Sequence, residues 1–397
     1  MKTLERIIVR EAKIMTRKEV MMKAINKKIT WIQAADILGI CDRQMRRIKK
    51  AYEKHGYDGL RDHRAGRPMR KRIQLETIQE VCRLKEKVYP DFSMKHFHEQ
   101  LLEKHSIQIS YNWMRIILEE AGIVQKAHGR GKHRRKRERR PMRGMLIHID
   151  GSRHAWIPGE PEQDLIVLLD DANGEMLYGQ FFEEEGTLST FSGLEHVLAH
   201  YGRFSELYHD RGSHFGKTSV AGHKVDEEQN GQVSRALRAL GIRQIFAYSP
   251  QARGRGERAF GTIQGRLPQE LRLAGITSYK KANEYLRKCF MPSFNKRFTV
   301  VPAQAESAFV PIAGIDLKLL LSIQEERVVR NDNTVSYKNL TLQIPPSKER
   351  LHYVRCPVMV HLFTDQTIGI SYQGKLLGQY TNEGEAILVK AKKKKAA

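Results

Sequence analysis

Three acidic residues in the middle of the sequence have the types and positions that could bind metal ions together. Asp150 ends the apolar stretch at 145–150, Asp210 ends a similar stretch at 204–210, and Glu257 follows a run rich in arginine and glycine. Carboxylates held close together repel one another unless cations neutralise them, and oxygen ligands select hard cations such as Mg²⁺. We therefore expect Asp150, Asp210 and Glu257 to be catalytic residues that bind two such ions.

The basic residues around Glu257 indicate what these ions would act on. Two ions about 4 Å apart can activate an attacking oxygen and stabilise a leaving one in a phosphoryl displacement. The neighbouring arginines could hold a phosphodiester backbone, and Gln264 lies seven residues further along the same helical face. The alternative is that Glu257 only forms a surface ion pair. We expect DNA contacts from four residues of this stretch: Arg253, Arg255, Arg258 and Gln264.

Other polar residues nearby have simpler explanations. Asp170 and Asp171 fall in a predicted hairpin turn, where aspartate is common for conformational reasons. We expect the three glutamates at 183–185 to form a solvated strand end. His148 and His209 could tune the site, or they could be strand histidines whose hydrogen bonds are satisfied locally.

The elements that would position the three acids alternate between strands and helices. Strands are predicted where short apolar runs occur, and helices where apolar residues recur every three or four positions. The predicted order is a strand (145–150), a hairpin (164–185), a helix (187–202), a strand (204–210), a helix (232–241), a strand (243–250) and a long helix from about 253 to 273. This pattern predicts an α/β domain with a mixed sheet over residues 144–312.

The N-terminal part, residues 1–58, predicts a DNA-binding module. Residues 29–53 form two short helical patterns separated by Gly39, with Asp42 as the expected cap of the second helix. Two helices joined by such a turn form a helix-turn-helix, whose second helix enters the major groove. The other possibility is a helical hairpin with a solvated basic face. The residues expected to face DNA are Arg43, Gln44, Arg46 and Arg47.

Two basic linkers could add affinity that does not depend on base sequence. Residues 59–72 are rich in arginine and turn formers, and ten of the eighteen residues at 126–143 are Lys or Arg. Segments of this composition cannot form a core, and on a duplex they displace counterions. The linker residues expected to contact phosphates are Arg64, Arg67, Arg134, Arg135 and Arg137.

The remaining segments are less specific. Residues 73–125 predict a second helical unit, which could be another helix-turn-helix or a packing module. Residues 313–390 alternate apolar and polar residues between close turns, which predicts a small β-barrel. The lysine-rich end, 391–397, is expected to be a solvated tail.

Composition limits the class of protein. The formal net charge is +24, and most of the excess lies in residues 1–144, so the partner is expected to be anionic. The four cysteines form no CxxC pair, which favours a reducing compartment over a cysteine zinc site. Neither a signal peptide nor a membrane-spanning helix is expected from the sequence.

Several motifs resemble the integrase-core transposases of bacterial insertion sequences, with the ISNCY type as the nearest group. The resemblance is carried by HIDGS (148–152), LLDDANG (168–174), LYHDRGSHF (207–215) and the segments at 249–276 and 294–309. It implies a ribonuclease-H-like core, an Asp-Asp-Glu (DDE) triad on Asp150, Asp210 and Glu257, and two Mg²⁺ or Mn²⁺ ions. It also supports reading 313–390 as a Src-homology-like barrel.

The resemblance implies a reaction and partners. Such an enzyme binds double-stranded DNA at the terminal inverted repeats, hydrolyses a phosphodiester there and joins the freed 3′-hydroxyl to target DNA. We expect a homo-oligomer assembled on DNA in the bacterial cytoplasm, associated with the nucleoid. Phe260 and Gly261 depart from the polar pair expected after the glutamate, and 216–231 is an expected inserted loop.

Two other functions fit parts of the sequence. The chain could be a catalytically inactive DNA-binding regulator derived from a transposase. It could also be a ribonuclease-H-type nuclease acting on RNA–DNA hybrids. Two helix-turn-helix units argue against the nuclease, because the narrow major groove of A-form duplexes excludes them.

Overall fold

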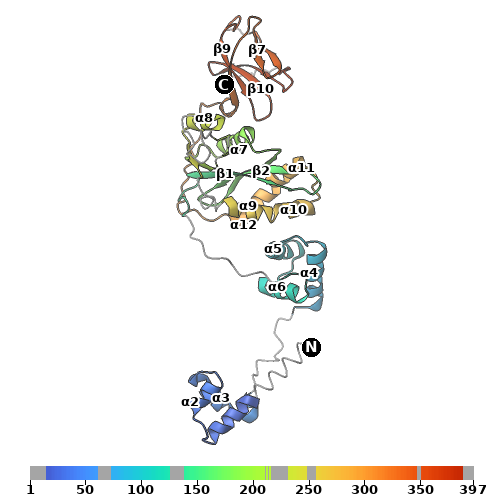
Figure 1. Cartoon of the computed structure of the whole chain (residues 1–397), viewed down its shortest axis with the longest axis vertical. Helices are drawn as coiled ribbons and strands as arrows, with labels where there is room; N and C mark the ends of the chain where they lie inside the picture. Colours follow the sequence, from blue (N-terminus) through green and yellow to red (C-terminus); the bar gives the residue numbers. More distant parts are fainter. Residues whose placement is uncertain are drawn as a thin grey trace, which may run out of the picture. The chain divides into compact units, whose positions relative to one another are not determined.

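The computed structural model describes residues 15–60, 73–125, 138–210, 212, 214–215, 231–247, 256–346 and 350–387. The chain divides into two compact units, Met1–Glu80 and Val81–Ala397. Figure 1 shows the elements of each unit along the chain.

The first unit contains a helix-turn-helix. Its helices span 15–25, α2 (Trp31–Ile37), α3 (Asp42–His55) and η1 (Gly56–Leu60). Thr30 caps α2 by accepting a hydrogen bond from the Gln33 amide, and Gly39 makes the turn with φ of 62°. Asp42 is the first residue of α3, and Cys41 is its N-cap, so the predicted cap was one residue too late.

A small core holds this unit together. It includes Met21, Ala34, Ala35 and Met45, all buried. Ile32 of α2 is 63% exposed. The two buried alanines of α2 share the core with Met45 of α3, and their small side chains allow close approach.

The second unit begins with a helical module. Its helices are α4 (Leu75–Lys87, which starts before the unit boundary), α5 (Met94–His105) and α6 (Tyr111–Glu120). Ser93 and Ser110 cap α5 and α6 by accepting backbone hydrogen bonds, as expected for serine at this position. Leu84, Phe97 and Met114 are part of a separate buried core for this module.

The α/β domain has a mixed five-stranded sheet, as predicted. The strands are β1 (Leu146–His154), β2 (Gln163–Asp170), β3 (Met176–Phe182), β4 (Glu206–His209) and β5 (Arg243–Phe246), in the order β3-β2-β1-β4-β5. The first three strands pair antiparallel, whereas β4 pairs parallel to both β1 and β5.

Helices cover both faces of this sheet (Figure 1). One core packs α7 (Thr187–His200) and α8 (Gln232–Ala239) against Ile147 and Ile149 of β1. The other core packs the second helical group against Leu165 and Val167 of β2. That group comprises α9 (Gly256–Gln264), α10 (Leu267–Leu273), α11 (Tyr279–Tyr285), η3 (Leu286–Phe290) and α12 (Met291–Phe298).

The single long helix predicted from about 253 to 273 is wrong. The described part of it is two helices, because α9 ends at Gln264 and α10 begins at Leu267. Gly265 weakens the helix, and Pro268 cannot donate a backbone hydrogen bond to continue it. Arg266 lies between the two helices and is 7% exposed.

The C-terminal part is a small β domain, and the predicted closed barrel is not confirmed. Among the described residues, its strands form an open five-stranded sheet, in the order β12-β11-β10-β9-β6, and a two-stranded sheet of β7 and β8. The two sheets share one core that includes Val335, Val360 and Ile370. The elements are α13 (Leu317–Leu320), β6 (Ile323–Val328), β7 (Thr334–Tyr337), β8 (Leu340–Gln343), β9 (Pro357–Leu362), β10 (Ile368–Tyr372), β11 (Lys375–Tyr380) and β12 (Ala386–Ile387).

In the described part of the chain, no helix has both the length and the apolar character needed to cross a membrane.

A buried histidine bridges two strands of the C-terminal domain. His361 Nδ1 lies 2.8 Å from Ser322 Oγ, and its Nε2 lies 2.7 Å from Ser371 Oγ. Ser322 donates its own hydroxyl proton to the Leu319 carbonyl, so Nδ1 of His361 donates to Ser322 and Nε2 accepts from Ser371. Burial, together with the charge of Arg235, lowers the pKa of His361 to about 4.

This histidine should make the C-terminal domain sensitive to acid. In the unfolded chain His361 takes up a proton near pH 6.5, whereas in the folded chain it stays neutral down to about pH 4. The unfolded state binds more protons in that window, so the free energy of unfolding falls as pH decreases from about 6.5 to 4. We expect a loss of about 1–2 kcal/mol at pH 5, measured by thermal denaturation of the full chain.

His361→Gln removes the buried histidine. His352→Gln is the matched control, because His352 is exposed. His361→Gln should flatten the pH dependence between pH 7 and 5, and His352→Gln should leave it unchanged. Equal pH dependence in wild type and His361→Gln would show that the assignment is wrong.

Candidate active site on β1 and after β4

The parallel pairing of β1 with β4 places two of the predicted catalytic residues. Leu146 pairs with Glu206 and His148 with Tyr208, so each residue of β1 lies opposite the residue 60 positions later. Continued by two residues, this register puts Asp150 level with Asp210. Side chains at level positions of neighbouring strands point to the same face of the sheet. Both aspartates are half-buried.

The pairing of β1 with β2 identifies that face. Asp150 is paired with Val167, which belongs to the core that contains Phe260 and Ile263 of α9. Ile149, in contrast, belongs to the core on the opposite face, beneath α7 and α8. Asp150 therefore lies on the side of the sheet that α9 covers.

Helix α9 brings Glu257 to the same side. A Cβ atom built on Gly256, the first residue of α9, would lie 3.1 Å from Asp150 Oδ2. Glu257 is the next residue and is exposed in the first turn of the helix. The segments that carry the three acids thus meet at one face, and the acids are of the right chemistry for a hard divalent cation.

The described residues contain no group of three or more His, Cys, Asp or Glu side chains that could hold a metal ion. The strand register and the close approach of Gly256 bring the segments of the three acids to one face, and the role of the acids as metal ligands stays a prediction. Residues 248–255, which precede α9 and include Arg253 and Arg255, lie outside the described residues.

His209 is a strand histidine with local partners. Its ring stacks on Phe215 at a centroid distance of 3.9 Å and meets Phe246 edge-on at 4.6 Å. Nδ1 donates to the Asp210 carbonyl at 2.6 Å. Burial lowers the pKa of His209 to about 4, so the ring is neutral near pH 7. It therefore fixes the backbone next to Asp210 without adding charge.

The second pair of aspartates holds the start of β1, as expected for turn residues. Asp170 accepts hydrogen bonds from the amides of Gly144, at 2.7 Å, and Ala172, at 2.8 Å. Burial raises the pKa of Asp170. Asp171 lies 2.7 Å from His148 Nε2, which explains why this histidine is buried beside the site. The side chains of Asp170 and Asp171 therefore hold the hairpin against the start of β1 and the residues just before it.

Of the thirteen residues predicted to contact DNA, six lie in the described part of the chain and seven lie outside it. On α3, Met45 is buried while all four predicted residues are exposed: Arg43, Gln44, Arg46 and Arg47. Arg258 is exposed in the first turn of α9, but Gln264 donates to Ser152 Oγ at 2.8 Å, inside the domain. The others lie outside the described residues: Arg64, Arg67, Arg134, Arg135, Arg137, Arg253 and Arg255.

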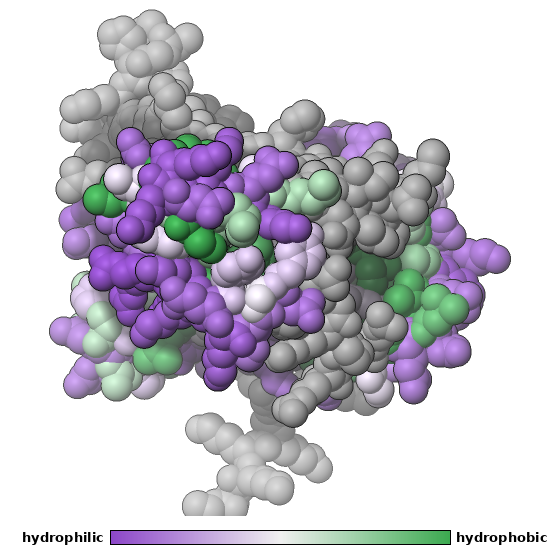
Figure 2. All heavy atoms as spheres, turned by 90° about the horizontal axis from the view of Figure 1, so that it is seen from below, coloured by the Kyte–Doolittle hydropathy of each residue, from purple (hydrophilic) through white to green (hydrophobic). Residues whose placement is uncertain are grey.

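Figure 2 shows one face of the molecule, on which hydrophilic residues cover most of the described surface and hydrophobic patches are small. Such a surface suits a hydrated, charged partner better than an apolar one.

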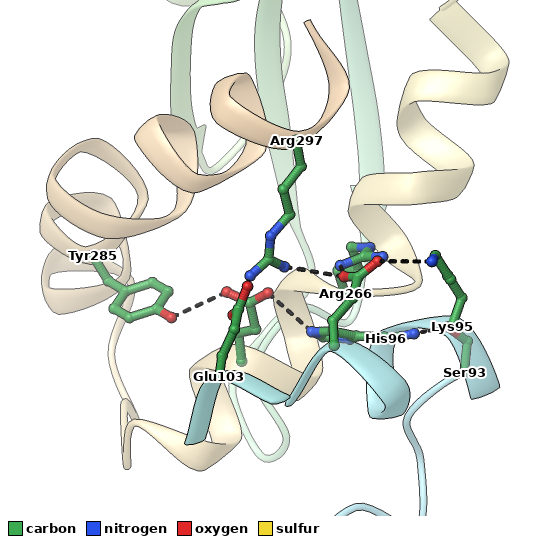
Figure 3. Close-up of polar contacts among 9 residues, drawn as sticks. Ser93, Lys95, His96, Glu103, Arg266, Tyr285 and Arg297 are labelled. Atoms are coloured by element: carbon green, nitrogen blue, oxygen red, sulfur yellow. Dashed lines mark hydrogen bonds and ion pairs between the residues drawn. The ribbon is translucent and has the colours of Figure 1, made fainter. Parts of the chain in front are cut away.

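An ionic contact joins α5 to the α/β domain, and no local sequence pattern indicates it (Figure 3). Glu99 of α5 accepts hydrogen bonds from Arg266, at 2.7 Å, and from Arg297, at 3.2 Å. Burial alone would raise the pKa of Glu99, but these arginines lower it overall. Arg297 also binds Glu103. The partners are 167 and 198 residues apart, so no local pattern could reveal them.

A second pair extends this contact. His96 Nε2 lies 3.1 Å from Glu270 Oε1, and Tyr285 donates to the other oxygen of Glu270 at 3.1 Å. Of the two readings of residues 73–125, these contacts support the packing module, because α5 is used to bind the α/β domain. Arg266 lies between α9 and α10, so Glu99 also anchors the end of the helix that carries Glu257.

Removal of Glu99 should therefore destabilise the α/β domain. Glu99→Ala leaves the buried Arg266 guanidinium without its carboxylate, and loss of one partner of a buried pair costs about 3 kcal/mol. Glu103→Ala is the control, because Glu103 is 44% exposed and its loss should cost less than about 1 kcal/mol.

The measurement is denaturant unfolding followed by the fluorescence of Trp156, which is fully buried in the α/β domain. Trp31 and Trp113 are replaced by Phe in all variants so that one probe remains. Equal losses of stability for Glu99→Ala and Glu103→Ala would contradict the anchoring role.

Comparison with known proteins gives the chain its family. A family described as "Helix-turn-helix domain" matches residues 16–69, which confirms the predicted motif. The putative transposase y4bF of Sinorhizobium fredii (strain NBRC 101917 / NGR234) is 30% identical over 368 residues, covering 91% of this chain and 79% of the relative. The transposase for insertion sequence IS1202 of Streptococcus pneumoniae is 26% identical over 377 residues, covering 86% and 80%.

Among solved structures, similar chains come from retroviral integrases. The HTLV-2 integrase catalytic core domain in complex with magnesium (dimeric form) has a TM-score of 0.30 at 14% identity, covering 41% of this chain and 93% of that one. A chain of the simian T-cell lymphotropic virus intasome in complex with PP2A regulatory subunit B56 gamma has a TM-score of 0.34 at 13% identity, covering 78% and 100%. On the evidence of its two relatives in sequence, the chain belongs to the transposases of insertion sequences.

Proposed function

We propose that the chain is a DDE transposase that cleaves transposon-end DNA and transfers the freed strand into target DNA. The observation that carries the proposal is the register of β1 with β4, which sets Asp150 level with Asp210 on the face that α9 covers. In the first turn of α9, Gly256 lies against Asp150 and Glu257 is the next residue. The membership in the transposase family supports the same reading.

Asp150, Asp210 and Glu257 are the residues that would hold two divalent ions, Mg²⁺ or Mn²⁺. When bound, such ions supply activation of the attacking oxygen and charge stabilisation of the leaving oxygen. Water is the first nucleophile and the freed 3′-hydroxyl is the second, so the protein forms no covalent link to DNA. Arg258, exposed in the first turn of α9, orients the phosphodiester beside these carboxylates.

The partner is double-stranded DNA, read at the terminal inverted repeats by α3. Arg43, Gln44, Arg46 and Arg47 face solvent on that helix and have the donors that base edges and phosphates accept. The basic linkers at 59–72 and 126–143 add sequence-independent affinity. The C-terminal β domain helps to hold the DNA, and a homo-oligomer brings two ends together. We expect a protein that acts on DNA in this way to be located at the bacterial nucleoid.

The catalytic proposal is tested by Glu257→Gln. Loss of one carboxylate should abolish Mg²⁺-dependent nicking of an end-containing oligonucleotide, while binding to that oligonucleotide is retained. Glu284→Gln, an exposed glutamate on α11, is the control and should nick at the wild-type rate. Equal nicking by Glu257→Gln would sink the assignment. A wild-type chain that binds ends but never nicks would instead favour the inactive regulator.

The reading of DNA by α3 is tested by Arg46→Ala. If this guanidinium contacts a base edge, the variant should lose about 1–3 kcal/mol of binding to end DNA and less on random DNA. If it contacts a phosphate, both should weaken equally and the slope of log affinity against log salt should fall by about one. Fluorescence anisotropy over a KCl series measures both. Lys288→Ala on η3 is the control. Equal effects of the two variants would contradict this role for α3.

A further inference from the structure

Glu185 touches the segment that carries Asp150. A Cβ atom built on Gly151 would lie 2.1 Å from Glu185 Oε2 and 2.6 Å from its carboxyl carbon. The carboxylate of Glu185 therefore occupies the space that a side chain at residue 151 would need. Only glycine can follow Asp150 while Glu185 keeps this position.

Glu185 also reaches the segment that carries Asp210. His214 Nε2 lies 3.6 Å from Glu185 Oε1. A Cβ atom built on Gly212 would lie 2.7 Å from His214 Cε1 and 3.1 Å from Asp210 Oδ1, so the imidazole and the Asp210 carboxylate flank this glycine. The Gly212 amide donates to Asp210 Oδ1 at 2.8 Å. His214 thus links Glu185 to the turn that orients Asp210.

Glu185 differs from the two glutamates before it. Glu183 and Glu184 are exposed, whereas Glu185 is half-buried. Its amide donates to Asp164 Oδ2 at 2.8 Å, and this bond fixes the chain between β3 and α7 where its side chain turns toward β1. The position of the Glu185 carboxylate is therefore set by the sheet itself.

We propose that Glu185 is a positioning residue that sets the separation of the Asp150 and Asp210 carboxylates, through Gly151 on one side and His214 on the other. The inference rests on the proposed function, since it matters only if these aspartates share metal ions. Groups that orient metal-binding carboxylates from outside commonly change metal affinity 10–100-fold when mutated.

The first test measures metal binding by the full chain without DNA. Isothermal titration with Mn²⁺ compares wild type, Glu185→Gln and Glu184→Gln, with Asp150→Asn as the reference for a lost ligand. We expect about a tenfold weaker Mn²⁺ affinity in Glu185→Gln and an unchanged affinity in Glu184→Gln. The Mg²⁺ concentration for half-maximal nicking should shift by a similar factor. Wild-type affinity in Glu185→Gln would overturn the proposal.

The second test uses the close approach of Glu185 and Gly151, without metal. Gly151→Ala should lower the denaturation midpoint of the α/β domain, because the added methyl overlaps the carboxylate. In the Glu185→Ala background the same substitution should cost much less. Gly261→Ala is the control, since nothing lies within 4 Å of a Cβ built there. An equal loss from Gly151→Ala in both backgrounds would overturn the contact.

The outcomes separate the two proposals. If Asp150→Asn binds Mn²⁺ and nicks DNA like wild type, the DDE assignment itself fails. If Asp150→Asn is inactive while Glu185→Gln matches Glu184→Gln in both measurements, only the role of Glu185 fails.

Discussion

The parallel ladder between β1 and β4 determines how the two aspartates of the candidate site lie relative to each other. Its register offsets the two strands by 60 residues, the same interval that separates Asp150 from Asp210. Continued two residues beyond the paired positions, this register puts the two aspartates level, on the face of the sheet opposite the core beneath α7 and α8. A slip of one residue would turn one aspartate into that apolar core.

The other parts of the α/β domain position groups around this ladder. His209 stays neutral and binds the Asp210 carbonyl, while Asp170 and Asp171 fix the start of β1. Helix α9 is held at both ends: Gly256 lies against Asp150, and beyond its last turn Arg266 is bound by Glu99 of α5. The helical module of α4, α5 and α6 thus supports the helix that carries Glu257.

The sequence predicted the elements better than their tertiary contacts. The apolar runs located β1 and β4, and the turn at Gly39 located the helix-turn-helix. Asp150 does not end its strand as expected, because β1 continues to His154. The contact of Glu99 with Arg266 had no local signal, because its partners are far apart and each looks like a surface charge. The same holds for Glu185, which cannot be told from Glu183 and Glu184 by composition. The barrel is not confirmed, because strand alternation does not show whether a sheet closes. The long helix at 253–273 is wrong, because Gly265 and Pro268 interrupt it.

If the proposed function is right, Asp150, Asp210 and Glu257 jointly bind a pair of divalent ions. Anomalous diffraction from crystals of the chain grown with Mn²⁺ and end DNA would locate these ions. We expect two Mn²⁺ peaks about 4 Å apart, each within bonding distance of at least one of the three carboxylates. Mn²⁺ bound elsewhere, with these carboxylates directed away from one another and from the DNA strand, would contradict it.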